Sequence, residues 1–258
     1  MSYLNAKPLI CDLDHSEDLR LVLDVPSRLL EGLRTRRMDV ALLPVIDYQR
    51  LEGLRVIPAS GIGCDGPTLT VRIFSRVPVQ RIRVMACDTD SHTSVALARV
   101  ILAEKHGISP QLIDWASHAE RRENRFPDVD AVLLIGDKVV CEEPRGFVHQ
   151  LDLGGEWRDL TGLPFVFAVW MTRRGVDVGD LPQRLEEAKR AGLTRVDDMI
   201  ARFAVPRGWP ADVARRYLCE YLKYDIGPRQ LQAISLFHRL AGKHGMIPIP
   251  VRELRLCK

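Results

Sequence analysis

The sequence contains no long apolar run, and nothing in it approaches the roughly 20 consecutive apolar residues that a membrane-spanning helix needs. An apolar stretch at residues 131–136 is bounded by Asp130 and Asp137. The N-terminus also lacks the basic segment followed by an apolar run that marks an export signal. We therefore expect a cytoplasmic protein that neither spans nor binds a membrane.

Cysteine pairs and clusters of metal ligands are lacking as well. The chain has 6 cysteines, none in a Cys-x-x-Cys pair and none alternating with histidine at metal-binding spacing. A secreted protein of this size would more often pair its cysteines in disulfides. The 7 histidines are scattered along the chain. We expect reduced, isolated thiols and no metal site.

Motifs for several chemistries are absent. There is no Gly-x-Ser-x-Gly elbow and no Walker phosphate loop, and residues 61–63 lack the third glycine and the following helix of a dinucleotide site. The formal net charge is only +3 and basic residues form no long run, which argues against nucleic acid as a partner. We expect no cofactor, whereas a small anionic ligand agrees with this charge.

What the chain does have is an ordinary globular composition, 46% apolar and 28% charged over 258 residues, at a length where two domains become common. Short apolar runs alternate with longer amphipathic ones, which predicts an α/β fold of parallel strands joined by crossover helices. The predicted strands span residues 19–25, 39–43, 54–58, 68–74, 81–88, 111–115, 131–136, 147–153 and 161–170. The predicted helices span residues 26–36, 92–106, 119–125, 185–191, 196–204, 211–222 and 229–241.

These elements predict two lobes. Residues 1–76 and 168–258 would form lobe 1, and residues 77–167 would form lobe 2. The segment 161–170 would cross back toward lobe 1, on which the C-terminal helices would pack. This arrangement resembles the two-lobed type II periplasmic-binding-protein-like fold. Its ligand lies in the cleft between the lobes, where strand ends and helix N-termini direct their backbone amides.

Residues 88–94, Asp-Thr-Asp-Ser-His-Thr-Ser, lie between a predicted strand and a predicted helix. Unpaired amides at a helix start, together with nearby hydroxyls, can hold a carboxylate. The alternative is that Ser91 or Ser94 only caps the helix, and spacing alone favours that alternative. However, 4 hydroxyl-bearing residues within 6 positions exceed the need of one cap. Ser91, Thr93 and Ser94 are therefore candidate ligand-binding residues.

Other candidates carry neutral donors or lie at a strand end. The amide of Asn5 can both donate and accept hydrogen bonds, although Asn5 could also be only a turn residue. Thr68 and Thr70 could present hydroxyls at the cleft edge, although threonine is common on half-exposed strands. Gly136 would let a ligand approach the end of an apolar strand, and Asp137 could accept from a ligand hydroxyl or merely cap the turn.

Several of these segments, taken in order, resemble the chorismate dehydratases of the futalosine route to menaquinone, the menaquinone biosynthesis dehydratase family. The matching segments are Ser2-Tyr3-Leu4-Asn5 with Pro8-Leu9, Asp39-Val40-Ala41-Leu42-Leu43-Pro44, Asp65-Gly66-Pro67, the 88–94 turn, Ile135-Gly136-Asp137 and Thr161-Gly162-Leu163-Pro164-Phe165. The resemblance implies a lyase that removes water from chorismate without a cofactor. It assigns a catalytic role to Asn5 and substrate binding to Thr70, Ser91, Thr93, Ser94, Gly136 and Asp137. The family usually has Ser-Val where this chain has Thr70-Val71.

The implied chemistry suits neutral side chains. Chorismate carries two carboxylates and becomes aromatic on losing water, so an enzyme mainly has to hold and polarise it. Donors at the ring carboxylate would stabilise the dienolate formed when the C3 proton leaves, after which the C4 hydroxyl departs. The matched motifs contain no positioned His or Glu, so the substrate's own enolpyruvyl carboxylate is the candidate base. Residues 163–167 could add an apolar wall beside the ring, whereas Trp157 and Trp170 are expected in the core.

Three alternatives remain open at this point. The sibling 1,4-dihydroxy-6-naphthoate synthase opens with a Pro-Asn-Asp type motif, which residues 5–7, Asn-Ala-Lys, do not match. A non-catalytic solute-binding protein would need an export signal, and a regulator's effector domain would need a helix-turn-helix. The resemblance also implies a short strand directly before Ser2, so we expect either a start further upstream or an incomplete first sheet.

Overall fold

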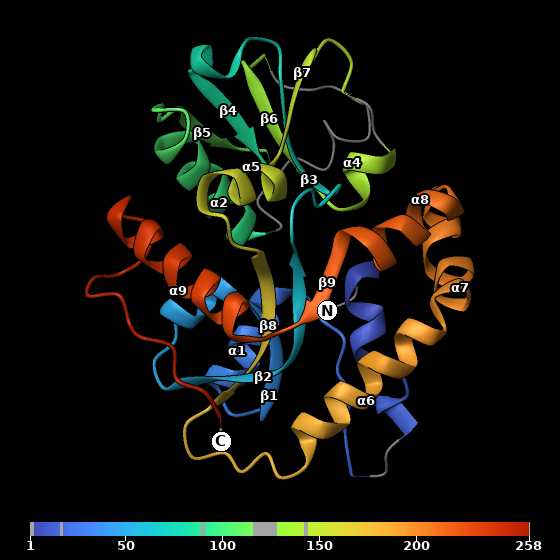
Figure 1. Ribbon diagram of the computed structural model, residues 1–258. Helices are drawn as coiled ribbons and strands as arrows, with labels where there is room; N and C mark the ends of the chain where they lie inside the picture. Colours follow the sequence, from blue (N-terminus) through green and yellow to red (C-terminus); the bar gives the residue numbers. More distant parts are fainter. Residues whose placement is uncertain (1–2, 16–17, 89–90, 116–127, 142–143, 258) are drawn as a thin grey trace.

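The computed structural model describes residues 3–15, 18–88, 91–115, 128–141 and 144–257. The helix predicted over residues 119–125 lies outside these ranges. Two sheets organise the described chain, one above the other in Figure 1, with β2 and β8 rising from the lower one. The lower sheet has the order β1 (Val40–Pro44), β8 (Phe165–Arg173), β2 (Leu54–Cys64) and β9 (Leu222–Asp225). The upper sheet has the order β5 (Gln111–Asp114), β4 (Val84–Cys87), β6 (Ala131–Ile135), β3 (Val71–Ser75) and β7 (His149–Asp152).

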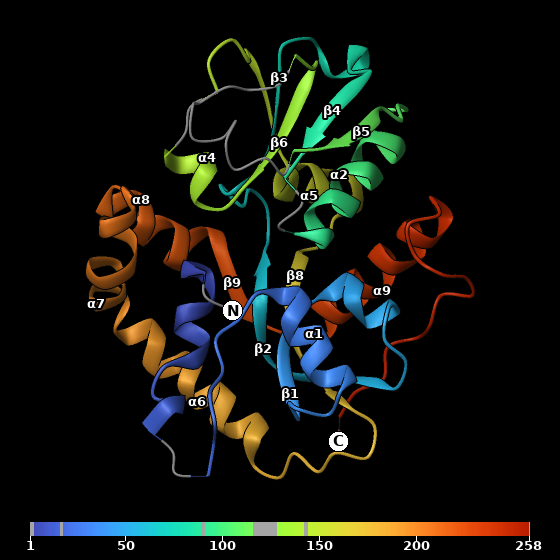
Figure 2. The same ribbon diagram turned by 180° about the vertical axis from the view of Figure 1, so that it is seen from behind.

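Helices cover both sheets and form the C-terminal part of the chain (Figure 2). The α-helices are α1 (Pro26–Arg34), α2 (His92–Glu104), α4 (Asp137–Cys141), α5 (Leu153–Thr161), α6 (Leu181–Thr194), α7 (Val196–Met199), α8 (Ala211–Arg216) and α9 (Pro228–Lys243). The short 3₁₀ helices are η1 (Leu4–Ile10), η2 (Leu13–His15), η3 (Val45–Gln49), η4 (Val79–Arg81) and η6 (Val205–Arg207). Two π-helical turns are η5 (Ile200–Ala204) and η7 (Tyr217–Tyr221).

The prediction of an α/β chain is confirmed, but among the described strands the parallel pairs are those of β4 with its neighbours β5 and β6. The pairs in the lower sheet are all antiparallel, as are those of β3 with β6 and β7. The predicted lobe boundaries also differ from sheet membership. The boundary at residue 76 placed residues 71–75 in lobe 1, whereas β3 pairs inside the upper sheet. The boundary at residue 168 divides β8.

The glycines at 61 and 63 lie inside β2, beyond the end of the strand predicted over residues 54–58. A Cβ on Gly61 would lie 2.6 Å from the carbonyl oxygen of Ala168, and one on Gly63 would lie 2.6 Å from that of Phe165. Only glycine allows β2 and β8 to approach each other this closely. The glycines therefore extend the strand pairing toward the upper sheet, and the chain turns only after Cys64.

The strand predicted over residues 19–25 is wrong, because this segment forms no strand. Its alternating pattern is real, but a strand also needs a neighbour that shares its backbone hydrogen bonds. A cavity of about 910 Å³ is lined both by residues 18–24 and by residues 38–42 of β1 and its approach. Within the described chain, β1 pairs only with β8. The segment therefore runs extended beside the lower sheet without joining it.

Helix α5 was not predicted, because Gly154 and Gly155 are poor helix formers in its first turn. The structure explains how the helix starts there: the Asp152 carboxylate accepts hydrogen bonds from the backbone amides of Gly154 and Gly155 at 3.0 and 3.2 Å. A Cβ on Gly154 would lie 2.5 Å from the carbonyl oxygen of Gly66. Close packing against the turn after β2 therefore requires glycine at position 154, although glycine has a low helix propensity.

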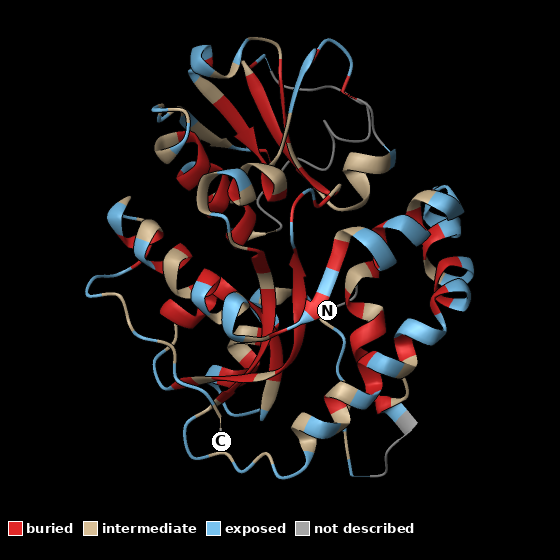
Figure 3. Cartoon of the chain, in the orientation of Figure 1, coloured by how far each residue is buried: buried red, intermediate tan, exposed pale blue. Residues whose placement is uncertain are grey.

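The central strands of both sheets are buried, whereas the edge strands β5 and β7 of the upper sheet and the outer faces of the C-terminal helices are more exposed (Figure 3). Trp157 lies fully buried, in edge-to-face contact with Phe165 and Phe237. Trp170 is buried and donates to the Ser60 hydroxyl at 3.2 Å. The expectation that both tryptophans belong to the core is confirmed. All six cysteines are free thiols.

The described helices include none that combines the length and the apolar character required to pass through a membrane.

Gly192 sets the contact between α6 and η1, the segment that carries Asn5. A Cβ at position 192 would lie 2.2 Å from the carbonyl oxygen of Pro8. Replacing a glycine by alanine in an open helix usually stabilises it by up to ~1 kcal/mol. We expect Gly192→Ala to lower the free energy of unfolding in urea by about 1–3 kcal/mol instead, through overpacking. Gly155→Ala is the control, because the atoms nearest its new Cβ lie 3.8 Å away, so stability should hold or rise. A Gly192→Ala variant as stable as the parent would contradict this packing.

His238 makes stability depend on pH. Burial lowers the pKa of His238 to about 4. Its Nε2 lies 2.8 Å from the Val45 carbonyl oxygen and donates to it, and its Nδ1 lies 3.1 Å from the Gln49 amide nitrogen. Contacts between Gln49 and the Arg252 backbone fix that amide nitrogen as the group facing the ring, so a proton on Nδ1 would meet another donor.

The ordinary histidine pKa is about 6.5, and at a pH between this value and the folded value the unfolded chain binds a proton that the folded chain does not. Low pH therefore favours the unfolded chain. The free energy of unfolding is highest above pH 6.5 and falls as the pH drops below it. We expect the unfolding free energy in urea to fall by up to ~3 kcal/mol across this window. The decline should flatten in His238→Gln and persist in His149→Gln, which changes an exposed histidine. If the unfolding free energy fell equally with pH in the parent and in both variants, His238 would not be the source of the pH dependence.

Candidate active site

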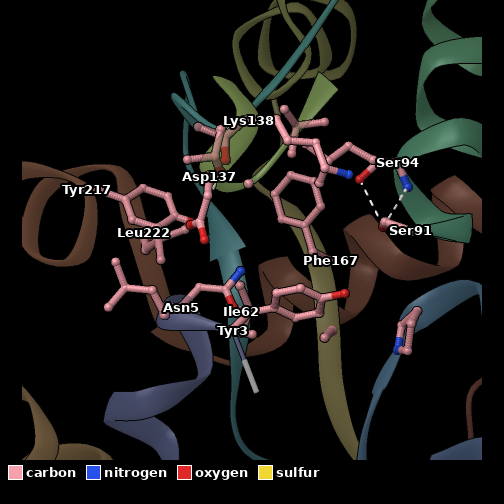
Figure 4. Close-up of a pocket in the computed structure, with 18 of the residues that line it drawn as sticks. Tyr3, Asn5, Ile62, Ser91, Ser94, Asp137, Lys138, Phe167, Tyr217 and Leu222 are labelled. Carbon is pink, nitrogen blue, oxygen red and sulfur yellow. Dashed lines mark hydrogen bonds between the residues drawn. The ribbon is translucent and has the colours of Figure 1, made fainter. Parts of the chain in front are cut away.

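A cavity of about 170 Å³ lies where the two sheets meet the C-terminal helices. Its walls come from η1, the turn before β3, the start of α2, the end of β6, the start of α4, β8 and the segment from Trp209 to Leu222. Figure 4 shows side chains from these separate elements pointing toward one another. The site is therefore assembled from parts that are far apart in the sequence.

Most of the predicted site residues gather here. The cavity is lined by Asn5, Thr70, Ser91, Ser94, Gly136 and Asp137, together with Thr68. Thr93 is not part of this lining: it is fully buried, and its hydroxyl has no hydrogen-bond partner among the described residues. Successive side chains point in different directions around the first turn of α2. Ser91 and Ser94 therefore face the cavity, whereas Thr93 points into the protein interior.

The start of α2 serves as both a helix cap and a cavity wall. The Ser91 hydroxyl accepts from the Ser94 backbone amide at 3.3 Å, and the two hydroxyl oxygens lie 3.0 Å apart. Capping, the alternative that spacing favoured, is thus confirmed, while both hydroxyls still line the cavity. Residues 89 and 90 of this turn lie outside the described residues. A helix N-terminus with two hydroxyls can hold an anionic group.

A buried hydrogen-bond network connects Asn5 to the opposite wall through Tyr217. The Thr70 hydroxyl donates to the Tyr217 oxygen at 3.1 Å, and the Asn5 side chain also hydrogen-bonds with this tyrosine. Burial raises the pKa of Tyr217 to about 12, against the opposing effect of these two hydrogen bonds. Tyr217 therefore stays protonated. The Asn5 Oδ1 atom is buried without a partner among the described residues.

The start of α4 brings two charged side chains to the cavity. Asp137 accepts from the Trp209 indole nitrogen at 2.9 Å, so its carboxylate contacts the C-terminal helical part. Lys138, the next residue, forms an ion pair with Asp88, which follows β4 and is fully buried. Of the described residues that line the cavity, Asp137 and Lys138 are the two with charged side chains.

The remaining wall is apolar. Phe167, Ile62 and Leu222 line the cavity, and Phe167 rests edge-on against the buried Phe165 at 4.8 Å between ring centroids. The suggestion that residues 163–167 add an apolar wall therefore agrees with the position of Phe167.

Sequence reasoning did not find Lys138, Trp209 or Tyr217. Lys138 had a usable signal, because it follows Asp137 directly at the end of a buried strand. Trp209 and Tyr217 had none, since their partners lie 72 and 147 residues away along the chain. Only the packing of the C-terminal helices brings these two side chains to the cavity.

The geometry can be compared with known proteins. A family model described as menaquinone biosynthesis matches residues 1–243. A chorismate dehydratase from Thermus thermophilus is 32% identical over 261 residues, which cover 93% of each chain. Among solved structures, protein AF1704 from Archaeoglobus fulgidus has a TM-score of 0.70 at 16% identity, covering 95% of this chain and 96% of its own. The alkanesulfonate-binding protein SsuA from Xanthomonas axonopodis has a TM-score of 0.67 at 17% identity, covering 96% and 91%. At these identities the two structures show the fold alone, which is periplasmic-binding-protein-like.

The Tyr217 network makes a prediction about stability. In Tyr217→Phe the Thr70 hydroxyl and the Asn5 amide lose their shared acceptor, which should lower the free energy of unfolding by about 1–3 kcal/mol. Tyr224→Phe is a matched control, because the Tyr224 hydroxyl is buried without a partner among the described residues. Removing that hydroxyl should leave stability unchanged or raise it. Urea unfolding of both variants tests the contrast, and an equal loss in the two would contradict the network.

Proposed function

The chain belongs to the menaquinone biosynthesis family, and from this premise we propose that it removes water from chorismate to give 3-[(1-carboxyvinyl)oxy]benzoate. It is accordingly an enzyme of menaquinone biosynthesis, and the reaction class proposed for it is that of a hydro-lyase. One observation carries the proposal: a chain 32% identical to a chorismate dehydratase over 93% of its length gathers Asn5, Ser91 and Ser94 around one cavity.

The cavity offers what this elimination requires. Loss of water makes the ring aromatic, so the driving force resides in the substrate and the enzyme contributes orientation and charge stabilisation. Departure of the C3 proton places negative charge on the ring carboxylate through the conjugated double bond. Hydrogen-bond donors fixed at that carboxylate stabilise this charge more in the transition state than in the bound substrate.

We assign the ring carboxylate to the start of α2, where Ser91 and Ser94 line the cavity and the helix dipole favours an anion. Phe167 would contact the face of the ring. Asn5 would orient the reacting centre through the departing hydroxyl, because its hydrogen bond with Tyr217 fixes the amide while its Oδ1 has no partner among the described residues. Thr70, Gly136 and Asp137 complete the proposed binding surface. Thr93, predicted to bind substrate, would act only through the packing of α2.

The proton acceptor is proposed to be the substrate's enolpyruvyl carboxylate. Among the described lining residues, Tyr217 stays protonated and Asp137 already accepts from Trp209 at 2.9 Å. The substrate's second carboxylate lies on the ether group attached to C3 itself. Orienting that group is then part of catalysis, a role that hydrogen-bond donors and an apolar wall can fill.

Two broader assignments go with this function. The two-lobed division of the chain stays a proposal, with the cavity between lobes, and sheet membership favours grouping β3 with lobe 2. A cytoplasmic location is also proposed, because six free thiols are typical of that compartment.

The decisive experiment incubates the purified protein with chorismate and follows the aromatic enol-ether product by mass spectrometry. Asn5→Ala should lower kcat by about 100-fold or more while KM changes by less than about 5-fold, because the amide acts on the reacting centre. Lys7→Ala, which changes a neighbouring residue outside the cavity lining, serves as the control and should retain most of the activity.

Three outcomes would argue against the proposal in different ways. Chorismate binding without product would favour a non-catalytic carboxylate-binding protein. Release of 1,4-dihydroxy-6-naphthoate from its cyclic precursor would identify the sibling enzyme. An Asn5→Ala variant with unchanged kcat would remove Asn5 from the reaction while leaving the dehydratase activity itself in place.

A further inference from the structure

The ion pair between Lys138 and Asp88 is produced by the topology of the upper sheet. Strands β4 and β6 are parallel neighbours, so their carboxyl ends meet at one edge of the sheet. Asp88 follows β4 directly, and its backbone amide donates to the Leu133 carbonyl of β6 at 3.1 Å. Lys138 is the second residue of α4, just after β6. The fold therefore brings this carboxylate and this ammonium together at the strand ends.

The same pair lies at the edge of the cavity. Asp88 is fully buried, whereas the Lys138 side chain is 20% exposed and is part of the cavity lining. Asp88 precedes the α2 cap Ser91 by three residues, and Lys138 lines the same cavity as the Ser91 and Ser94 side chains. Figure 4 shows Lys138 reaching into the cavity from the upper wall. Lys138 supplies the one cationic side chain among the described lining residues.

We propose that Lys138 binds the ring carboxylate that Ser91 and Ser94 hold, and that Asp88 positions its ammonium for this contact. The inference rests on the proposed function and makes the anion site charged rather than purely neutral. An ammonium has three N–H donors, so it can keep Asp88 as a partner and also donate to a ligand carboxylate. Charge-assisted hydrogen bonds of this kind are shorter and stronger than neutral ones. Lys138 thereby selects carboxylate ligands over neutral isosteres.

Asp88 has a clear role in this arrangement. A lone ammonium in a small, partly buried cavity would lose hydration without compensation, and a lone buried carboxylate would do the same. Paired, the two opposite charges compensate each other, and the pair fixes the long lysine side chain. When a carboxylate enters, the ammonium is shared between two anions at a helix N-terminus, where the dipole favours negative charge. Asp88 is therefore a positioning residue that acts through Lys138.

The competing explanation is that Lys138 only neutralises Asp88. Lys138→Met alone cannot separate the two, because it leaves Asp88 buried without its partner and destabilises the fold in either case. The double variant Asp88→Asn with Lys138→Met removes both charges together and retains similar volumes. If Lys138 is merely a counter-ion, this double variant should bind ligands as the parent does.

The experiment measures dissociation constants for benzoate and for its neutral isostere benzamide, and in parallel KM for chorismate. In the parent, benzoate should bind more tightly than benzamide. In the double variant, benzoate binding should weaken and the chorismate KM should rise by about tenfold or more, while benzamide binding stays within about twofold. Lys138→Arg should keep most of the preference for benzoate. Lys105→Met removes a lysine that pairs with Glu156 and Asp159 outside the cavity lining, and should leave all three constants unchanged.

Unchanged benzoate binding and KM in a folded double variant would overturn the proposal. If the double variant does not fold, Lys138→Gln decides, because its amide can still donate to Asp88 while the positive charge is removed: benzoate binding should weaken by about threefold or more relative to benzamide, and an unchanged ratio would overturn the proposal. A parent that makes no product from chorismate but prefers benzoate over benzamide through Lys138 would reject the dehydratase assignment alone.

Discussion

The antiparallel pairing of β2 with β8 is the constraint on which the rest of the structure depends. These two strands join the lower sheet to the elements above it, and Gly61 and Gly63 let their backbones approach at the point where the chain leaves β2. Side chains of both strands, Ile62 and Phe167, then form the apolar wall of the cavity. Because the crossing is fixed, the turn that carries Thr70 and the start of α2 are presented to η1 and Asn5.

The polar part of the cavity follows a simple rule of burial. Polar groups removed from water need partners, and most of them here have one: Thr70 pairs with Tyr217 and Asp137 with Trp209 across the cavity, and Asp88 pairs with Lys138 at its edge. The side-chain amide oxygen of Asn5, Oδ1, is the exception among the described lining residues. A ligand hydroxyl that donates to this oxygen would supply the hydrogen bond that it lacks.

The sequence predicted those parts of the fold whose signals are local. The apolar run 131–136, the amphipathic helix after Ser91 and the helix 229–241 appear close to their predicted places as β6, α2 and α9. The strand predicted over 19–25 fails because pairing depends on a neighbour, which periodicity does not report. Helix α5 was missed because tight packing against Gly66, and not helix propensity, determines the glycine at 154.

The same distinction applies to the site. Asn5, Ser91 and Asp137 stand in short segments whose residue order resembles a family, so they could be found from the chain alone. Tyr217 and Trp209 enter through contacts between distant parts of the chain, and nothing in their own neighbourhoods marks them. Thr93 was grouped with Ser91 and Ser94 because the three are close in sequence, but the helical turn separates their directions.

The contacts that close the cavity also have a kinetic consequence. Thr70 and Asp137 belong to the part of the chain built on the upper sheet, whereas Tyr217 and Trp209 belong to the C-terminal helices. With the bond from the Cys141 thiol to the Arg207 carbonyl at 3.4 Å, hydrogen bonds of about 1 kcal/mol each would hold the open arrangement, in which these walls are separated, to a few per cent of the molecules or fewer. A ligand that enters between these walls would then associate at a rate reduced by the small fraction of molecules that are open, well below the frequency of diffusive encounter.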